Sequence, residues 1–167
     1  MPKGLKQTSS VVSIGFQVLE TGANTFTQGS VDLNLSPLDR EVFVVLAVNM
    51  DPFNPDLGAA ESQVATSLTT TSQLATTNLS NSNCMANAIT SIKADATRAV
   101  GLITGAVETP PATLEYIGII ATNDFFVQVT GLGNTVAKGV TGKLYGYRAR
   151  ADADIYSALV QSEVLSA

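Results

Sequence analysis

Histidine and tryptophan are missing from this 167-residue chain, and the only cysteine is Cys84. Without histidine, the chain lacks the usual base that activates a serine or cysteine nucleophile, and it lacks the commonest metal ligand. A single cysteine excludes an internal disulfide, so the fold does not depend on an oxidising compartment. We therefore predict no enzyme activity, no cofactor and no metal, with Cys84 acting as a small buried hydrophobic residue.

Charge is also scarce. Only 14% of the residues are charged, against about 25% in an average soluble domain, whereas 45% are hydrophobic. Such a composition excludes a disordered chain, and the net charge of −5 argues against a dedicated nucleic-acid binder. Two interpretations of the low charge remain. Serine, threonine and asparagine cover the surface, or other subunits hide much of it.

No hydrophobic run is long enough to cross a membrane. The most apolar stretch, residues 42–48, has seven residues, and a spanning helix needs about 20. The opening "MPKGLKQTSS" leads into no hydrophobic segment, so we expect no secretory signal. Because residues 42–48 are apolar on both faces and rich in valine, they predict a central strand covered on both sides. The second cover is the other sheet, a C-terminal helix or a neighbouring subunit.

Period-two alternation predicts the remaining strands. We expect strands at residues 12–18 and 31–35, an exposed or edge strand within 62–73, and further strands at 98–107, 113–122, 125–131 and 137–150. Residues 85–93 have helical spacing and predict a short helix or turn, and residues 155–164 predict a short amphipathic helix. About eight strands separated by Gly, Pro and Asn turns indicate an all-β single jelly roll or β-sandwich. We expect one domain over residues 1–167, with a polar N-terminal arm at 1–10 and a C-terminal helical tail at 149–167.

Asp51 and Asp56, in "MDPFNPD", are the best candidates for chemistry. Two carboxylates in a cleft can hydrolyse glycosides, and together with Asn49 and Asn54 they supply oxygen ligands for calcium. The spacing matches no EF-hand, and Pro52 with its neighbours explains the stretch as a rigid turn that ends the strand. The nearby "GLGNTVAKG", residues 131–139, superficially suggests a phosphate loop, but its position between two strands favours a hairpin turn.

Four basic residues lie near the C-terminus. They are Lys138, Lys143, Arg148 and Arg150. Such residues contact an anionic surface, or they are solvated or paired within the chain. Tyr145 and Tyr147 lie beside two of them and suit either stacking on sugars or bases or packing between subunits, where Tyr and Arg are favoured.

Three stretches, "DREVFVVLAVNMDPFNPD", "TTTSQ" and "GKLYGYRARADADIYSALVQSEVLSA", give the chain a resemblance to a virus family. The chain resembles the small single jelly-roll major capsid proteins of tailless icosahedral viruses of archaea and bacteria that contain an internal membrane. The resemblance implies two four-stranded sheets, a virion location and self-assembly of many copies into an icosahedral shell. It implies that the partners are copies of the chain itself. A second coat protein and the viral membrane are candidate further partners, and no sequence-specific nucleic acid is expected as a partner. The alternative is a carbohydrate-binding or adhesion module, or a subunit of another extracellular assembly.

Overall fold

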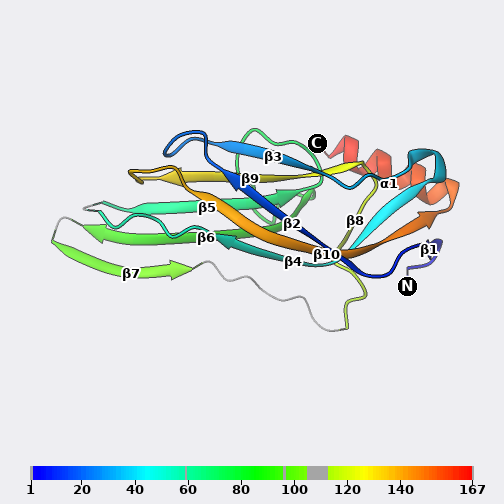
Figure 1. Cartoon of the computed structure of the whole chain (residues 1–167), viewed down its shortest axis with the longest axis horizontal. Coiled ribbons are helices and arrows are strands. Elements are labelled where there is room, and N and C mark those ends of the chain that lie inside the picture. The colour runs from blue at the N-terminus through cyan, green and yellow to red at the C-terminus, as the bar shows by residue number, and fades with distance from the viewer. Residues whose placement is uncertain (1, 59, 96, 105–112, 167) are drawn as a thin grey trace.

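The computed structural model describes residues 2–58, 60–95, 97–104 and 113–166. In these ranges the chain forms ten strands, one 3₁₀ turn at Pro37–Asp39 and one α-helix (Figure 1). The elements are β1 (Leu5–Gln7), β2 (Val12–Leu19), β3 (Thr27–Asp32), β4 (Glu41–Pro52), β5 (Ser62–Thr69), β6 (Cys84–Asp95), β7 (Arg98–Thr104), β8 (Gly118–Ile120), β9 (Asp124–Leu132), β10 (Gly139–Ala151) and α1 (Ala153–Leu165).

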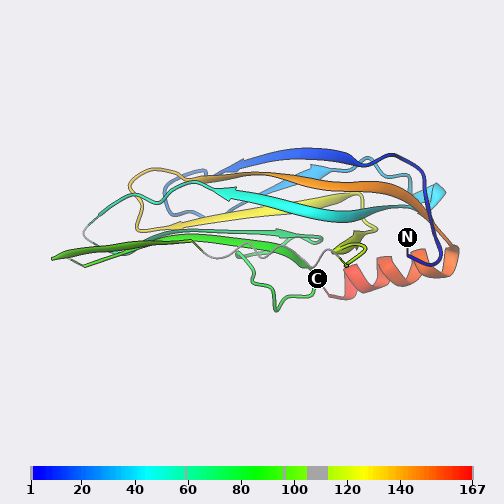
Figure 2. The ribbon, with the colours of Figure 1, turned by 90° about the horizontal axis from the view of Figure 1, so that it is seen from below.

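The strands form two antiparallel sheets that face each other (Figure 2). Sheet 1 has the order β2-β10-β4-β8, with β1 also paired to β10 beyond the end of β2, and sheet 2 has the order β3-β9-β5-β6-β7. Along the chain, strands of the two sheets follow one another: sheet 1 contains β2, β4, β8 and β10, and sheet 2 contains β3, β5, β6 and β9. This is the strand order of a jelly roll, in which two Greek keys are wrapped into a sandwich. The predicted all-β jelly roll with a short C-terminal helix is confirmed.

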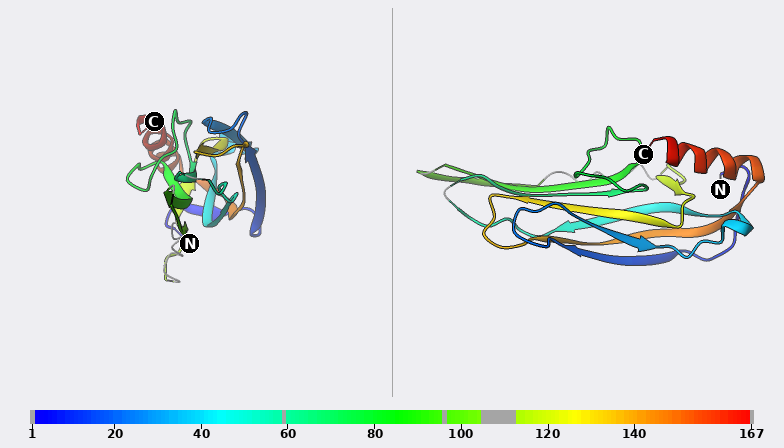
Figure 3. Two further views of the ribbon diagram at one scale, coloured as in Figure 1. Left: turned by 90° about the vertical axis from the view of Figure 1, so that its left-hand side faces the viewer. Right: turned by 90° about the horizontal axis from the view of Figure 1, so that it is seen from above.

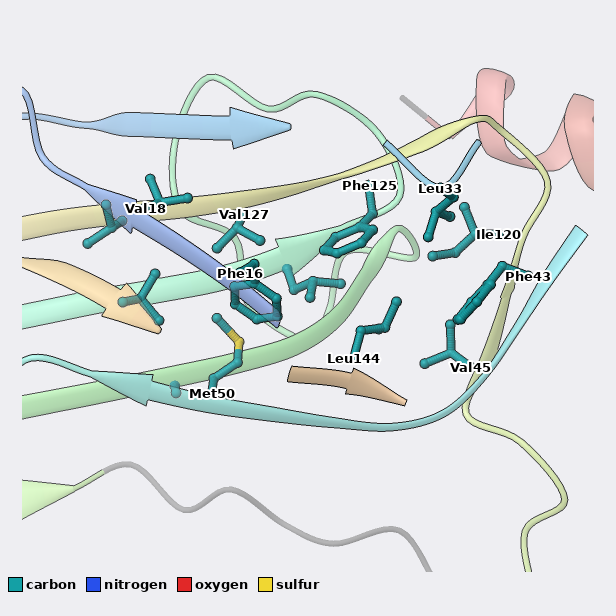
Figure 4. Packing of buried hydrophobic residues seen from close by; sticks show 14 of the residues in the cluster. Phe16, Val18, Leu33, Phe43, Val45, Met50, Ile120, Phe125, Val127 and Leu144 are labelled. Atoms are coloured by element: carbon teal, nitrogen blue, oxygen red, sulfur yellow. The ribbon is translucent and has the colours of Figure 1, made fainter. Parts of the chain in front are cut away.

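The core fills the space between the two sheets (Figure 4). At its centre the rings of Phe16 from sheet 1 and Phe125 from sheet 2 meet edge to face, with centroids 5.9 Å apart. The buried hydrophobic residues around them are Val18, Leu33, Leu35, Phe43, Val45, Met50, Val64, Leu68, Ala88, Ile120, Val127, Val129, Val140 and Leu144.

A β-bulge at Leu46 divides the central strand β4 into two halves. The pairing register with β10 shifts there, and Leu46 is left without a partner on β10. Phe43 and Val45 face the core before the bulge, whereas Val48 and Met50 face it afterwards. The bulge therefore reverses the alternation of side chains, which is one reason why residues 42–48 show no alternation in the sequence.

The other reason is a second hydrophobic cluster on the opposite face of the same strands. Val42 and Val44, both fully buried, point into this cluster, and α1 covers it. Figure 3 shows α1 lying along one end of the sandwich. The second cover of the strand is thus the chain's own C-terminal helix. The other buried members are Leu5, Ala121, Tyr147, Ala149 and Ala151, and the helix contributes Ile155, Tyr156, Leu159 and Val160.

Glu163 fastens the last turn of α1 to the end of β8. The backbone N–H groups of Ala121 and Thr122 donate to its two carboxylate oxygens, at 2.9 and 3.0 Å. The side chain is buried, and this burial raises the pKa of Glu163 despite the two donors. α1 has no basic residue in its last turn to offset the carboxylate, so burial favours the neutral form of Glu163 in the folded chain.

Both ends of the chain dock on their own sheet. The predicted arm at residues 1–10 contains β1, whose Leu5 is buried in the cluster under α1. The predicted tail at 149–167 begins inside β10, and its helix starts at Ala153 as the amphipathic pattern indicates. Within the described residues, no helix combines the length and the apolar character that crossing a membrane requires.

The prediction of a short helix or turn at residues 85–93 is wrong, because this segment belongs to β6. Cys84 and Ala86 pair with adjacent residues of β5, so Met85 between them has no partner of its own. Beyond this bulge the pairing with β5 is continuous, so Ile89 and Ile92, three residues apart, lie on opposite faces of the strand. Apolar side chains on both faces, together with Met85, recur at a spacing that imitates a helix.

The prediction of an exposed or edge strand within residues 62–73 is also wrong. β5 lies between β9 and β6, and its Thr66 and Ser67 are fully buried. The hydroxyl of Thr66 donates to the carbonyl of Ala88 at 2.7 Å, and that of Ser67 donates to the amide oxygen of Gln128, also at 2.7 Å. Burial of hydroxyl groups is tolerated here because each has a hydrogen-bond partner.

The strand predicted at residues 31–35 lies earlier in the chain, at β3. Leu33 and Leu35 are buried in the core as their alternation indicates, but they follow the strand. Their backbone N–H groups bond instead to the carbonyl and the side-chain oxygen of Asn123, at 2.8 and 2.7 Å. The alternation therefore identified the buried side chains and not the paired backbone.

Phe125→Ala should strongly destabilise the chain, because the ring is fully buried and its loss leaves a cavity beside Phe16. We expect a loss of about 3–5 kcal/mol in the free energy of unfolding, measured by urea denaturation. The control Leu38→Ala, whose side chain is 97% exposed, should change it by less than about 0.5 kcal/mol. Similar losses in both variants would contradict this description of the core.

Glu163→Gln should alter how stability depends on pH. Because the pKa of Glu163 is raised by folding, its contribution is fully present below the unfolded pKa of about 4.3 and is lost as pH rises through the folded pKa. Glutamine resembles the protonated acid and does not titrate. The urea midpoint of the wild type, relative to Glu163→Gln, should therefore fall as pH rises from about 4 to 7. A difference that stays constant or rises would contradict the prediction.

Candidate functional site: the loop end of the sandwich

Three loops meet at the end of the sandwich that lies opposite α1 (Figure 1). They are residues 20–26 between β2 and β3, residues 53–58 and 60–61 between β4 and β5, and residues 133–138 between β9 and β10. We call this region the loop end. It contains both stretches that the sequence singled out for chemistry, "MDPFNPD" and "GLGNTVAKG".

An ion pair joins two of these loops. The Nζ of Lys138 lies 2.5 Å from Oδ1 of Asp56, and the side chains of Lys138 and Asp56 are only 10% and 27% exposed. The other oxygen of Asp56 accepts the backbone N–H and the hydroxyl of Thr135, at 2.9 and 2.8 Å, and the N–H of Val136 at 3.3 Å. These interactions, with Lys138 foremost, hold the pKa of Asp56 well below its usual range.

The predicted hairpin turn in "GLGNTVAKG" is present, and it binds the chain's own carboxylate. Gly133 adopts a φ of +66°, and a Cβ there would lie 2.3 Å from the carbonyl oxygen of Glu61. Glycine is required for both reasons. The turn directs the N–H groups of Thr135 and Val136 at Asp56, which explains why the stretch superficially suggests a phosphate loop.

Asn134 links all three loops. Its backbone N–H and carbonyl bond the side chain of Asn24 reciprocally, both at 2.8 Å. Its side-chain amide donates to the carbonyl of Gln63 and accepts the backbone N–H of Asp56, both at 2.9 Å. Asn134 is 5% exposed, so the side chain acts as an internal cross-link.

Glu20 completes the network from β2. One carboxylate oxygen accepts the backbone N–H of Gly131 at 2.6 Å, and the other accepts that of Lys138 at 2.8 Å. The side chain is buried, and a Cβ at Gly131 would lie 3.0 Å from both oxygens. No pattern in the sequence marks Glu20, because its partners are backbone groups more than 100 residues away.

Asp51 and Asp56 do not form an acid pair. Asp51 is exposed on the outer face of β4, opposite Thr141 of β10, whereas Asp56 is committed to Lys138 and Thr135. Among the described residues, no group of three or more Cys, Asp or Glu side chains is arranged to hold a metal ion. The geometry makes Asp56 a structural residue.

The four basic residues near the C-terminus have different roles. Lys138 is buried and paired with Asp56. Arg148 donates to the carbonyl of Leu33 at 2.8 Å and lies 3.6 Å from Glu41, and Arg150 lies 3.2 Å from Asp39. Lys143 is exposed on the outer face of sheet 1. Three of the four are therefore paired within the chain.

Tyr145 and Tyr147 do not form a platform together with the arginines. Tyr147 is 8% exposed and packed under α1, and this burial raises its pKa. Tyr145 is half-buried. Arg148 follows Tyr147 in β10 and reaches Leu33 on the other side of the sheet. Alternation along the strand separates the aromatic and basic side chains.

Cys84 is half-buried at the start of β6. Its thiol donates to the carbonyl of Ala86 at 3.3 Å, and burial raises its pKa. A thiol with a raised pKa has little thiolate character, so it is a poor nucleophile. This agrees with the interpretation of Cys84 as a small packing residue.

A second polar network, which the sequence did not predict, lies on the outer face of sheet 2. The amide of Gln128, fully buried in β9, donates to the hydroxyl of Thr69 at 2.6 Å and to Gln28 of β3 at 3.0 Å. The loop at residues 70–83 covers this face, and its Gln73 and Thr77 donate backbone N–H groups to Gln28 and Ser67. The Ser/Thr-rich stretch thus covers the sheet and bonds to it through backbone groups of Gln73 and Thr77.

Asp56→Asn should weaken the loop end at neutral pH. Because folding lowers the pKa of Asp56, its contribution is present above the unfolded pKa of about 3.9 and is lost as pH falls. The urea midpoint should therefore drop at pH 7, and the difference from the wild type should shrink at about pH 3. Asp51→Asn, on an exposed side chain, is the matched control and should leave the midpoint unchanged. An equal difference at both pH values would contradict the ion-pair account.

Comparison with known proteins adds little beyond the fold. No protein-family model and no curated protein sequence matches the chain. A solved structure named Desmodium yellow mottle tymovirus aligns with 92% of this chain and 95% of its own, at 16% identity and a TM-score of 0.34. The assignment of the chain to the jelly rolls rests on its own strand order.

Proposed function

We propose that this chain is a viral coat protein that self-assembles into an icosahedral shell. The observation that carries the proposal is the strand order, β2-β10-β4-β8 facing β3-β9-β5-β6, because the single jelly roll is an architecture of viral capsid domains. Residues 1–167 act as one β-sandwich unit in this proposal. The location is the virion, and the main partners are copies of the chain itself.

The use of the polar side chains supports a structural role. Hydrogen bonds that join strands or loops engage the polar atoms of four side chains, namely Glu20, Asp56, Asn134 and Gln128. A catalytic group must keep a polar atom available for substrate. The candidate carboxylate Asp56 is instead saturated with donors from its own chain, which favours a building block over an enzyme.

The surface supports assembly. Large apolar side chains are exposed at both ends and over sheet 2, including Leu38 and Leu74, each 97% exposed, and Leu165, which is 84% exposed. With only 14% charged residues, the chain has little charge to keep these surfaces apart. Many weak contacts of this kind, repeated around a closed shell, give a stable assembly through multivalency.

The finer identity follows the family resemblance. We propose a coat protein of the internal-membrane type of tailless icosahedral virus. A second coat protein and the viral membrane are further partners in that proposal. Lys3, Lys6 and Lys143 are exposed cations that suit an anionic lipid surface or an acidic partner.

Carbohydrate recognition is the weaker alternative. Jelly rolls also include lectins, but the pair Tyr145 and Tyr147 that motivated this function is split by burial of Tyr147 under α1. Tyr145 alone remains on the outer face of sheet 1, near Lys143 and Asn49.

Electron microscopy of the purified chain tests the proposal. We expect regular closed particles, or rings and sheets of repeating subunits, when the protein is concentrated. Assembly should depend only weakly on salt, because the charge density is low. A chain that stays monomeric at high concentration, in both low and high salt, would contradict a role as a self-assembling coat protein.

A further inference from the structure

We infer that Asn78 is an acceptor site for an N-linked glycan, presented to a glycosyltransferase by the loop at residues 70–83. Asn78 opens the triplet Asn-Leu-Ser, which is the acceptor pattern for attachment of a glycan to an asparagine side chain. The same triplet occurs a second time, at residues 34–36. A three-residue pattern arises often by chance, so the structural setting of each copy decides whether it is a site. Such a modification goes beyond the proposed coat function and does not depend on it.

The triplet at Asn78 forms an exposed turn in the loop between β5 and β6. Figure 2 shows this loop standing out from the outer face of sheet 2. The backbone N–H of Asn81 donates to the carbonyl of Asn78 at 3.1 Å, which closes a turn over Leu79 and Ser80. Asn78 and Ser80 are exposed, and the side chain of Leu79 is 70% exposed. A transferase therefore reaches all three residues without unfolding the chain.

The nitrogen atom that carries an N-linked glycan is available in Asn78. Its Oδ1 accepts the backbone N–H of Ser80 at 3.0 Å and also the hydroxyl of Ser80, which fixes the side chain in an Asx turn. Within the described residues, the Nδ2 of Asn78 donates to no protein atom. The side-chain amides of Asn81, Asn83 and Asn87 all donate to other groups of the chain, at 2.6–3.4 Å. Among the asparagines of residues 78–87, Asn78 is thus the one whose nitrogen is not engaged.

The second copy of the triplet is built into the core. Its central residue, Leu35, is 7% exposed and packs in the hydrophobic cluster between the sheets. The backbone N–H of Leu35 donates to Oδ1 of Asn123 at 2.7 Å, and the hydroxyl of Ser36 donates to Asp39 at 2.9 Å. Asn34 is itself exposed, but a transferase reads this triplet only after Leu35 has left the core. The fold therefore makes one of two identical triplets accessible and closes the other.

The reaction is the transfer of a sugar from an activated donor to the amide nitrogen. The Nδ2 of Asn78 forms a bond to C1 of the sugar, while the bond from C1 to a phosphate oxygen breaks. The phosphate leaves with the electron pair of that bond, and one amide proton passes to a base of the transferase. The donor is a sugar phosphate ester of a nucleotide or of a membrane lipid. A nucleotide-linked sugar reaches the chain without passage of the chain across a membrane.

A glycan at Asn78 supplies hydration that this part of the surface lacks. No charged residue occurs between Glu61 and Lys93, and the side chain next to the acceptor, Leu79, is largely exposed. Glycans are bulky and solubilising. One attached at Asn78 hydrates the charge-free loop and covers the leucine beside it.

Glycosyl transfer to the folded, full-length chain tests the site. The purified chain is incubated with UDP-glucose and a transferase that reads Asn-X-Ser triplets, and peptide mapping by mass spectrometry locates the added hexose. Asn78 should be modified at least about tenfold faster than Asn34, because Leu35 must first leave the core.

Matched controls separate the effect of the fold from that of the local sequence. Two synthetic peptides, residues 30–40 and 74–84, report the rate of each triplet outside the fold, and each rate in the chain is divided by that of its own peptide. Ser80→Ala removes the hydroxyl that completes the triplet and should abolish transfer, whereas Ser80→Thr should retain it. Ser82→Ala removes an exposed hydroxyl outside the triplet and should leave transfer unchanged. Circular dichroism checks that each variant folds, and Asn78→Gln repeats the test if Ser80→Ala does not.

The chain isolated from its natural source tests whether the site is used. Its intact mass and peptide map should show a glycan on Asn78 and none on Asn34. A series of chains that differ by single sugars indicates stepwise addition from nucleotide-linked donors. One added block of fixed size indicates a lipid-linked donor.

Three results would overturn the inference. Equal normalised rates at Asn78 and Asn34 would show that the fold does not select between the triplets. A folded chain modified at neither position, although both peptides are modified, would show that the loop does not present the acceptor. A natural chain with an unmodified Asn78 would show that the site is not used, even where transfer to the purified chain succeeds.

Discussion

The pairing of β4 with β10 is the constraint on which the rest of the structure depends. These two strands form the centre of sheet 1, and the bulge at Leu46 reverses which side of β4 faces the core. On one side of the bulge, Val42 and Val44 require an outer cover, and α1 supplies it. On the other side, Met50 returns to the core and Asp51 faces solvent. The unpaired residue Leu46 therefore determines which part of the outer face of sheet 1 is apolar and covered by α1, and which part is exposed to solvent.

The polar side chains follow a common arrangement at several points of the molecule. Glu20 and Asp56 turn inward to backbone donors at the loop end, and Glu163 of α1 does so at the end of β8. Gln128 bonds to side chains under the loop at residues 70–83. Buried polar groups with complete hydrogen bonding specify loop and helix positions that apolar packing alone leaves free. The consequence is a surface poorer in free charge than the sequence already suggests, and apolar residues are exposed in its place.

The sequence predicted those features that depend on one strand at a time. Alternation identified β2 and the inward residues of β9, the amphipathic pattern identified the helix near Ile155, and the double-faced run identified β4 as central. It failed where pairing between distant strands decides. Apolar residues on both faces of β6 imitated a helix, and the buried hydroxyl of Thr66 made a central strand look exposed. The candidate site shows the same limit. Asp56 was singled out as a candidate for chemistry, whereas the structure pairs it with Lys138, which is 82 residues away, and no local pattern connects the two.

We propose that the apolar, charge-poor surface of this chain serves for contact with further copies of itself. Sedimentation velocity of the purified wild-type chain over a range of concentrations tests this claim most directly. The account predicts species many times heavier than one 17.3 kDa chain, whose share grows with concentration. A single boundary at the mass of one chain, at every concentration and salt level, would contradict it.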